Sequence, residues 1–260
     1  MKKQRTVQDI AARMKEGKVS PEEIEELKSD PRKGVRRLLE SYRRKQVLEE
    51  QENSRLRRLF RLEKALQKAG YYNVAGVDEA GRGPLAGPVV AAAVVLPSES
   101  YLQGLNDSKQ LSFRRREEIF EEIKVKARAV DWATADVQEI DYINIHRASL
   151  MAMKRAVQKL EERVDFVLVD GFSMEGINLP QRPVKKGDSR CASIAAASVV
   201  AKVVRDRMMQ ELDELYPGYG FAQHKGYGTA DHREAILRLG PAPPHRKSFL
   251  KNVCGTEVSR

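Results

Sequence analysis

The sequence predicts an α/β domain whose mixed sheet is flanked by helices, preceded by a small all-helical extension. Up to about residue 68 the apolar residues recur at helical spacing, whereas short apolar runs typical of strands begin at about Tyr71. Three successive strands, a helix, two more strands and further helices follow, which is the order expected of a mixed sheet covered by helices. We therefore divide the chain into an extension, residues 1–70, and a main domain, residues 71–260, that ends in a helical tail.

Capping residues mark the starts of three helices in the extension. Each start has a capping residue, alone or followed by proline, ahead of an amphipathic run: Thr6 with Asp9, Ser20-Pro21 and Asp30-Pro31. The third helix is expected to extend to about residue 68, with a break near residues 53–54 as an alternative.

Five strands are expected in the main domain. They cover residues 72–79, 88–96, 128–137, 164–170 and 181–184, with a glycine-rich loop between the first two. Helices are expected to begin near residue 112, to run over residues 145–162 and to begin again at residue 189. Small side chains in the last helix, such as Ala192, Ala195 and Ala196, would let it lie close against the sheet.

The positive charge of the chain is unevenly distributed. The formal net charge is +10, and residues 1–70 hold 20 Lys/Arg against 12 Asp/Glu. Residues 1–30 balance at seven against seven, so the excess lies between residues 31 and 70. A basic segment beside a nearly neutral domain predicts that the extension binds a polyanion while the domain performs the chemistry. A solvated, salt-bridged helix would have the same composition.

Composition also limits the compartment and the ligands. Cys191 and Cys254 lie far apart and form neither a CxxC pair nor a zinc ligand set. The polar N-terminal residues do not resemble a signal peptide, and both apolar stretches, residues 84–96 and 191–201, are shorter than the roughly 18 residues that cross a bilayer. We expect a cytoplasmic protein that has no membrane association and works as a monomer.

Four carboxylates stand where an apolar strand ends or meets a helix. Asp78 and Glu79 end the first strand, Asp170 ends the fourth, and Asp188 precedes the last long helix. Each has an ordinary explanation, because acidic residues are common in turns and Asp188 would serve as a helix N-cap. Together they predict a site for hard divalent cations, Mg²⁺ or Mn²⁺, at one edge of the sheet. Neighbours in a regular strand face opposite sides, so Asp78 and Glu79 can share that site only if the strand ends or bulges there.

A glycine loop follows the first pair of acids. Gly81 and Gly83 lack the Cβ atom that would keep a ligand away from the backbone, and Arg82 between them carries a guanidinium suited to phosphate. Exposed backbone N–H groups in such a loop suit phosphate or sugar oxygens. The sequence contains no complete P-loop signature, which argues against a nucleotide phosphotransferase.

With these motifs the sequence resembles ribonuclease HII, the bacterial type 2 ribonuclease H. The resemblance rests on an ordered set of motifs within residues 72–235: the run 76–90, Asn106-Asp107-Ser108-Lys109, Val169-Asp170-Gly171, the stretch 186–206 and the run 224–229. The arginine in Gly81-Arg82-Gly83 agrees with type HII, and a type HIII-like enzyme is the alternative within the superfamily. The extension and the tail after about residue 241 are expected to lie outside the common core.

The resemblance implies a ribonuclease H fold and endonucleolytic cleavage of the RNA strand of RNA–DNA hybrids. It also implies cutting at a single ribonucleotide embedded in duplex DNA. Both reactions would use two metal ions, held by Asp78, Glu79, Asp170 and Asp188. A non-catalytic nucleic-acid-binding protein is the alternative from another class, but it would not explain four acids placed where they repel phosphate.

The resemblance also implies roles for residues outside the acid cluster. The loop Gly81-Arg82-Gly83 would recognise the ribose through its 2′-hydroxyl, which distinguishes RNA from DNA. Tyr227 would stack on the sugar that follows the ribonucleotide. Lys109 is expected to contact phosphate. His224 is expected to be structural, because four acids and metal ions leave it no required role in proton transfer.

Overall fold

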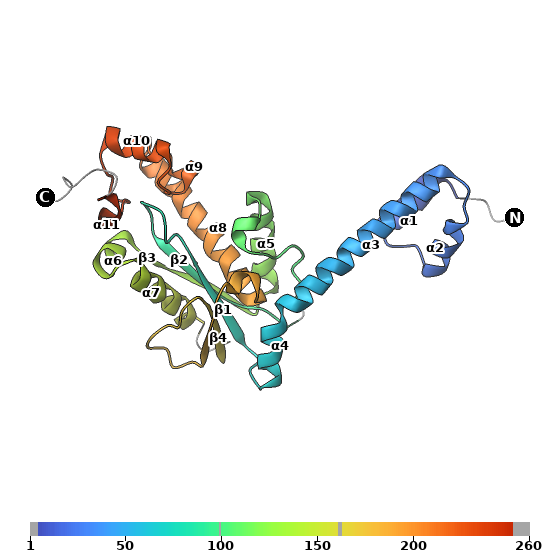
Figure 1. The fold of residues 1–260 in the computed structure, drawn as a ribbon, viewed down its shortest axis with the longest axis horizontal. Helices are drawn as coiled ribbons and strands as arrows, with labels where there is room; N and C mark the ends of the chain where they lie inside the picture. The colour runs from blue at the N-terminus through green and yellow to red at the C-terminus, as the bar shows by residue number, and fades with distance from the viewer. Residues whose placement is uncertain (1–4, 99, 161–162, 252–260) are drawn as a thin grey trace. The chain divides into compact units, whose positions relative to one another are not determined.

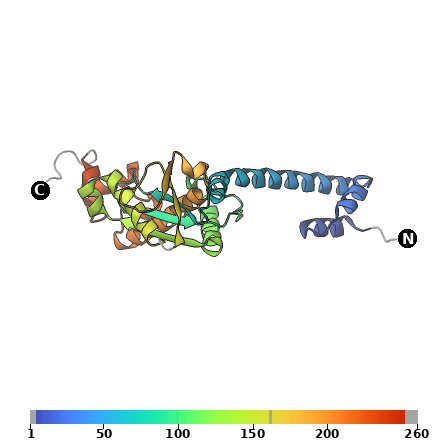
Figure 2. The ribbon, with the colours of Figure 1, turned by 90° about the horizontal axis from the view of Figure 1, so that it is seen from below.

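The computed structural model describes residues 5–98, 100–160 and 163–251. The chain divides into two compact units, Met1–Arg55 and Leu56–Arg260. The division falls inside helix α3 (Lys33–Leu59), which Figure 2 shows as one uninterrupted helix. The expected single helix to about residue 68 and the alternative of a break near residues 53–54 are therefore both wrong: α3 ends at Leu59, and α4 (Arg61–Lys68) begins after Phe60.

The first unit consists of α1 (Val7–Lys15), α2 (Pro21–Lys28) and most of α3. Both short helices begin with the capping boxes expected from the sequence. The Thr6 hydroxyl accepts a hydrogen bond from the Asp9 N–H, and the Asp9 carboxylate accepts one from the Thr6 N–H, both at 3.1 Å. Ser20 and Glu23 repeat this arrangement at 3.2 Å. Four buried residues form the apolar core of this unit: Ile10, Met14, Val35 and Leu39.

The second unit is built on a five-stranded mixed sheet, and all five expected strands are present (Figure 1). The β1–β2 and β2–β3 pairs are antiparallel, whereas β1–β4 and β4–β5 are parallel. The parallel pairs bring the C-terminal ends of β1, β4 and β5 to the same end of the sheet. In the spatial order β3-β2-β1-β4-β5, the strands are β1 (Val74–Ala80), β2 (Val89–Val95), β3 (Ala129–Ala135), β4 (Phe166–Asp170) and β5 (Gln181–Val184).

Helices cover both faces of the sheet (Figure 1). One face carries α5 (Phe113–Lys126) and the long α8 (Ala192–Leu215), and the other carries α6 (Val137–Ile143) and α7 (Ile145–Gln158). Alternation along β2 produces this division, because Val90, Ala92 and Val94 pack with α5 and α8 while the residues between them pack with α7. No helix among the described residues combines the length and the apolar composition that membrane crossing requires.

Helix α8 lies directly on β1 at the middle of the sheet. A Cβ atom at Gly76 would lie 2.1 Å from the carbonyl carbon of Ser193, so only glycine fits there. The small residues expected to permit this approach, including Ala192, Ala195 and Ala196, are fully buried. In the described residues that follow α8 there are three short helices: α9 (Phe221–His224), α10 (Ala230–Leu239) and α11 (Lys247–Leu250).

The end of α3 and the whole of α4 belong to the second unit by their packing. Leu56 and Phe60 lie in the same apolar cluster as α8. The buried Glu63 carboxylate accepts hydrogen bonds from the Ser193 N–H at 2.8 Å and the Ser193 hydroxyl at 2.9 Å. The N-cap residue of α8, Cys191, forms no side-chain capping bond of its own. Glu63 therefore caps α8 from a helix that is distant in sequence.

We predict that Glu63→Ala destabilises the protein by about 1–3 kcal/mol, because the buried Ser193 N–H and hydroxyl lose their acceptor. Lys68→Ala, at an exposed position of the same helix, should change the free energy of unfolding by less than about 0.5 kcal/mol. Urea unfolding followed by circular dichroism measures both variants. Equal stabilities of the two proteins would contradict the capping role.

Candidate active site

Parallel pairing of β1 with β4 brings two of the expected acids together. The ladder is in register up to the residues just before Asp78 and Asp170, so these carboxylates follow at the C-terminal ends of adjacent strands. Alternation places Asp78 on the same face as Gly76 and Asp170 on the same face as Leu168, and both of those residues face α8. The two carboxylates therefore lie on the α8 side of the sheet.

Asp78 is a buried carboxylate in a negative environment, with only 5% of the residue exposed. Burial and the charges of Glu79 and Asp170 raise the pKa of Asp78 well above its ordinary value. Hydrogen bonds from the Glu79 N–H, at 2.7 Å, and from Ser198 of α8 act in the opposite direction. The Ser198 hydroxyl oxygen also lies 2.9 Å from that of Ser108. Helix α8 thus supplies both the burial and a polar contact to this acid.

Glu79 occupies the next position of β1, which continues without a bulge to its end at Ala80. The ladder with β4 stops at Val77, but pairing with β2 continues through Glu79 to Ala80, so the expected strand end or bulge at this pair is absent. Burial raises the pKa of Glu79, although Arg82 Nη1, 3.2 Å from Glu79 Oε1, opposes this effect. The charge of Asp170 nevertheless acts on Glu79 and contributes to raising its pKa. Among the described residues, Glu79 Oε2 is buried and has no hydrogen-bond partner.

Asp188 lies in the 3₁₀ turn η3 (Gly187–Ser189) and does not cap a helix. Helix α8 begins at Ala192 with Cys191 as its N-cap, so the capping explanation for Asp188 and the expected helix start at residue 189 are both wrong. The Gly187 N–H donates to Asp170 Oδ1 at 2.6 Å, which holds this turn against β4. Burial, followed by the charge of Asp188, raises the pKa of Asp170.

Lys109 lies in the 3₁₀ turn η1 (Ser108–Gln110), with its Nζ 3.8 Å from Asp188 Oδ2. Burial disfavours its charged form, but the carboxylates of Asp107 and of three of the four acids outweigh this effect and raise the pKa of Lys109. Lys109 and the acids therefore share one electrostatic neighbourhood. Its expected contact with phosphate stays a prediction.

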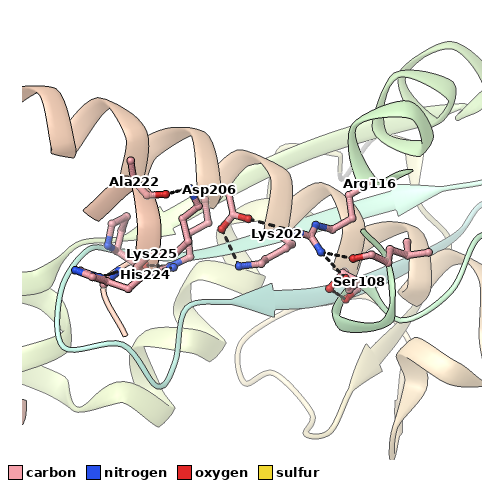
Figure 3. Close-up of polar contacts among 12 residues, drawn as sticks. Ser108, Arg116, Lys202, Asp206, Ala222, His224 and Lys225 are labelled. Atoms are coloured by element: carbon pink, nitrogen blue, oxygen red, sulfur yellow. Dashed lines mark hydrogen bonds and ion pairs between the residues drawn. The ribbon is translucent and has the colours of Figure 1, made fainter. Parts of the chain in front are cut away.

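A largely buried ionic network holds the Lys109 turn against α8 (Figure 3). Asp206 of α8 lies 2.7 Å from Lys202 Nζ and 3.8 Å from Arg116 Nη2. Arg116 Nη1 donates to the carbonyl oxygens of Ser108 at 3.0 Å and Leu111 at 2.6 Å. Sequence reasoning assigned no role to this network. The sequence nevertheless contained a signal for this network, because Ser108 and Asp206 both lie within the motifs on which the family resemblance rests.

The glycine loop between β1 and β2 meets the turn that carries Tyr227. The Leu85 N–H donates to the Gly226 carbonyl at 2.8 Å. A Cβ atom at Gly83 would lie 3.7 Å from Tyr227 Cε1, so the aromatic ring lies beside the loop, and Tyr227 is 45% exposed. Because Arg82 in the same loop bonds to Glu79, the loop and Tyr227 lie on the side of the acids.

His224 has contacts that hold this turn. Its Nδ1 accepts a hydrogen bond from the Gly226 N–H at 3.1 Å, and its Nε2 lies 2.7 Å from the Tyr219 carbonyl oxygen. The ring stacks on that of His232, with 4.2 Å between the centroids. Both nitrogens are therefore engaged with the backbone, which agrees with a structural role.

The donor set has the chemistry that hard divalent cations require. Every side-chain donor is a carboxylate oxygen, and one of them, Glu79 Oε2, is buried without a partner within the described residues. The raised pKa values of Asp78 and Asp170 reflect burial and repulsion that a cation would relieve. In the part of the chain that the structure describes, no three His, Cys, Asp or Glu side chains are grouped tightly enough to hold an ion. The acids share a neighbourhood without forming a closed ligand cage.

Solved structures identify the class of protein to which this fold and site belong. The PCNA:RNase HII complex from Archaeoglobus fulgidus contains a similar chain, with a TM-score of 0.58 and 27% identity, covering 68% of this chain and 95% of that one. The mixed sheet and its flanking helices have the ribonuclease H fold, and the chain is a metal-dependent nuclease of this class.

The sequence profile described as Ribonuclease HII matches residues 75–252. The ribonuclease HII of Geobacter metallireducens is 56% identical over 193 residues, covering 74% of this chain and 91% of that relative. The ribonuclease HII of Geobacillus kaustophilus is 47% identical over 247 residues and covers 95% of each chain. The chain belongs to the ribonuclease HII family, and it is a ribonuclease H that acts on RNA–DNA hybrids.

Family profiles match most of the extension and part of the tail after residue 241. A second profile, described as the Ribonuclease HII N-terminal domain, matches residues 6–67, and the main profile extends to residue 252. The expectation that the tail after about residue 241 lies outside the common core is therefore wrong. The extension is matched by a separate profile and lies before the main one, which begins at residue 75, as expected.

We predict that Asp78→Asn stabilises the metal-free protein at neutral pH. The folded pKa of Asp78 is raised, so its contribution to stability is present below the unfolded pKa and is lost as the pH rises through the folded pKa. An amide resembles the protonated acid at every pH and avoids that loss. We expect a gain of about 1 kcal/mol, or about 2–4 °C in Tm.

Thermal unfolding in EDTA at neutral and at mildly acidic pH measures this gain, which should shrink at the lower pH. Glu234→Gln, at an exposed position in the middle of α10, is the control and should show no gain. A parent protein as stable as Asp78→Asn at neutral pH would contradict the electrostatic account of this site.

Proposed function

We propose that this ribonuclease HII, besides cutting the RNA strand of hybrids, cuts duplex DNA at a single embedded ribonucleotide by two-metal-ion catalysis. The observation that carries the proposal is the convergence of carboxylates at adjacent strand ends beside a glycine loop and Tyr227. The acids would bind the cations, while the glycine loop and the Tyr227 ring would recognise the sugar of a single ribonucleotide.

Four acids would hold two ions of Mg²⁺ or Mn²⁺: Asp78, Glu79, Asp170 and Asp188. Divalent cations in two-metal sites activate water and stabilise the leaving oxygen of a phosphodiester. The unpartnered, buried Glu79 Oε2 and the raised pKa values of Asp78 and Asp170 support this assignment. Lys109, 3.8 Å from Asp188, balances part of the negative charge and can bind a phosphate that approaches the acids.

The ribose would be read by Gly81-Arg82-Gly83 through its 2′-hydroxyl. Tyr227 would stack on the sugar that follows, which would favour a junction between RNA and DNA. The proximity of Tyr227 to Gly83 supports a joint action of the ring and the loop. The monomeric state stays a prediction. The cytoplasmic location stays a prediction.

We predict that the parent protein with Mg²⁺ cuts a DNA duplex that contains one ribonucleotide, whereas Asp170→Asn and Asp188→Asn lose at least about a hundredfold in rate. Asparagine keeps the volume but removes the charge that a cation requires. Gel analysis of a labelled duplex under single-turnover conditions measures the rates. Asp231→Asn, at an exposed position of α10, should retain the parent rate.

The outcomes separate the parts of the proposal. Substantial cutting by Asp170→Asn would remove that acid from the metal site. Cutting of a continuous hybrid but not of the single-ribonucleotide duplex by the parent would remove the junction activity and leave the metal site intact.

We also propose that the first unit, Met1–Arg55, helps to bind the nucleic acid. It holds 15 Lys/Arg against 11 Asp/Glu. Along α3 four exposed arginines form no side-chain hydrogen bond or ion pair with any described residue: Arg36, Arg37, Arg43 and Arg44. Unpaired guanidinium groups along one helix suit successive phosphates. Residues 56–70 carry the rest of the basic excess, but their packing belongs to the catalytic unit.

Deletion of residues 1–55, which spares Glu63 and Phe60, should weaken binding and flatten its salt dependence. The slope should fall by about 0.9 for each phosphate that the first unit neutralises. Affinity for a ribonucleotide-containing duplex is titrated with salt in the Asp78→Asn background, which prevents cutting. The double variant Arg43→Gln/Arg44→Gln in the full chain should reproduce part of the effect. Identical salt slopes for the deletion and the parent would show that the first unit does not contact the substrate.

A further inference from the structure

Two fully buried arginines lie beneath the glycine loop, and sequence reasoning assigned neither a role. Arg205 comes from α8 and Arg246 from the start of α11, so residues distant in sequence meet under the same loop. Neither forms an ion pair with a carboxylate among the described residues, and every hydrogen bond that their guanidinium groups donate there goes to a backbone carbonyl. Burying two charges without a carboxylate partner costs free energy. We infer that this cost is tolerated because the two arginines hold the backbone of the loop in one conformation.

Arg246 contacts both ends of the loop. Its Nη2 donates to the Gly81 carbonyl at 2.6 Å, and its Nη1 donates to the Arg82 carbonyl at 3.0 Å. Its Nε and Nη2 donate to the Gly87 carbonyl at 3.0 and 2.7 Å. The Arg246 N–H also donates to the Leu85 carbonyl at 2.8 Å. A planar fork with five donors can hold several carbonyl oxygens at once, which the single ammonium of lysine cannot do with the same geometry.

Arg205 holds the second half of the loop and ties it to the turn that carries Tyr227. Its Nε and Nη2 donate to the carbonyls of Pro88 at 3.0 Å and Ala86 at 3.1 Å, and its Nη1 donates to the Lys225 carbonyl at 3.0 Å. Burial lowers the pKa of Arg205 to about 10. Burial, followed by the charge of Arg205, lowers the pKa of Arg246 to about 9. Both groups therefore stay charged at neutral pH.

The contacts of Arg246 determine where two loop N–H groups point. In a trans peptide the carbonyl of one residue and the N–H of the next point in opposite directions. Because the Gly81 and Arg82 carbonyls point at Arg246, the N–H groups of Arg82 and Gly83 point away from it. Neither N–H donates a hydrogen bond to another described residue. They are two adjacent donors, held in one direction and available to a ligand oxygen.

We propose that Arg246, supported by Arg205, is a positioning residue for ribose recognition: it fixes the peptide planes of the glycine loop so that the Arg82 and Gly83 N–H groups face the nucleic acid. This inference rests on the proposed reading of the ribose by the loop. It assigns the segment that contains Arg246 to the substrate site, although that segment follows the last strand of the sheet and touches none of the acids in any described contact.

The test compares Asp78→Asn with Asp78→Asn/Arg246→Lys, so that no substrate is cut. The dissociation constant is measured in Mg²⁺ for two duplexes of one sequence, one with a single ribonucleotide and one of DNA only. The parent in this test, Asp78→Asn, should bind the duplex with the ribonucleotide more tightly than the DNA-only duplex. In Arg246→Lys this preference should fall about tenfold, the factor that corresponds to one hydrogen bond. Affinity for the DNA-only duplex should change by less than about twofold, because phosphate contacts lie elsewhere.

Arg155→Lys is the matched control in the same background. Arg155 of α7 donates to the Thr134 carbonyl at 3.0 Å and pairs with Glu139 at 2.7 Å, far in sequence from the loop, and its replacement should leave the preference unchanged. A purely structural arginine would alter Tm and the active fraction without altering the ratio of the two affinities. If Arg246→Lys does not fold, the same measurement is made on Arg205→Lys, which should also show a reduced preference for the duplex with the ribonucleotide.

A folded Arg246→Lys or Arg205→Lys protein with the full ribonucleotide preference overturns the inference alone. A parent protein without any preference overturns the proposed ribose recognition, and the positioning role with it. The two failures are distinguished by the parent measurement.

Discussion

The close approach of α8 to β1 at Gly76 is the constraint on which the rest of the structure depends. Because the helix lies on the sheet backbone, with a side chain excluded at Gly76, Asp78 is enclosed beneath it. The same helix places Ser198 near Asp78, Asp206 at the centre of the network that holds the Lys109 turn, and Arg205 under the glycine loop. A small shift of α8 would therefore affect the acids, the lysine and the loop together, because all three are positioned by contacts with this one helix.

Buried charges of both signs organise the site in different ways. The acids lie at strand ends, where burial and mutual repulsion raise the pKa values of Asp78 and Asp170, and a cation bound there would relieve that repulsion. The arginines under the glycine loop have carbonyl oxygens as partners instead of carboxylates, so their charge orients peptide groups. Separation of the two sets matters, because a direct pairing of arginine with the acids would compete with metal binding. Within the described residues, the exposed Arg82 links the two sets, because its guanidinium bonds to Glu79 and its carbonyl accepts a hydrogen bond from Arg246.

Charge and packing divide the chain at different places. Composition gives a basic segment up to residue 70, and the family profile of the N-terminal domain ends at residue 67. Packing instead assigns everything from Leu56 onward to the catalytic unit, where Glu63 caps α8. The basic residues of α4 are thus on a helix that packs against the catalytic unit and caps α8. The basic residues of the first unit are on helices that pack around a separate small apolar core. A deletion that respects packing is therefore the informative one.

The sequence by itself determined the strands, the capping boxes of α1 and α2, the four candidate acids and the family, because periodicity, capping chemistry and ordered motifs are local properties of the chain. It did not reveal the tertiary cap at Glu63, the turn that contains Asp188, or the burial of Arg205 and Arg246. Arginine and glutamate are ordinary surface residues in a single sequence, and Asp188 stands where a helix N-cap is expected. Their roles depend on partners that are distant in sequence, and only the packing of α4, α8 and the C-terminal segment around the sheet brings those partners within hydrogen-bonding distance.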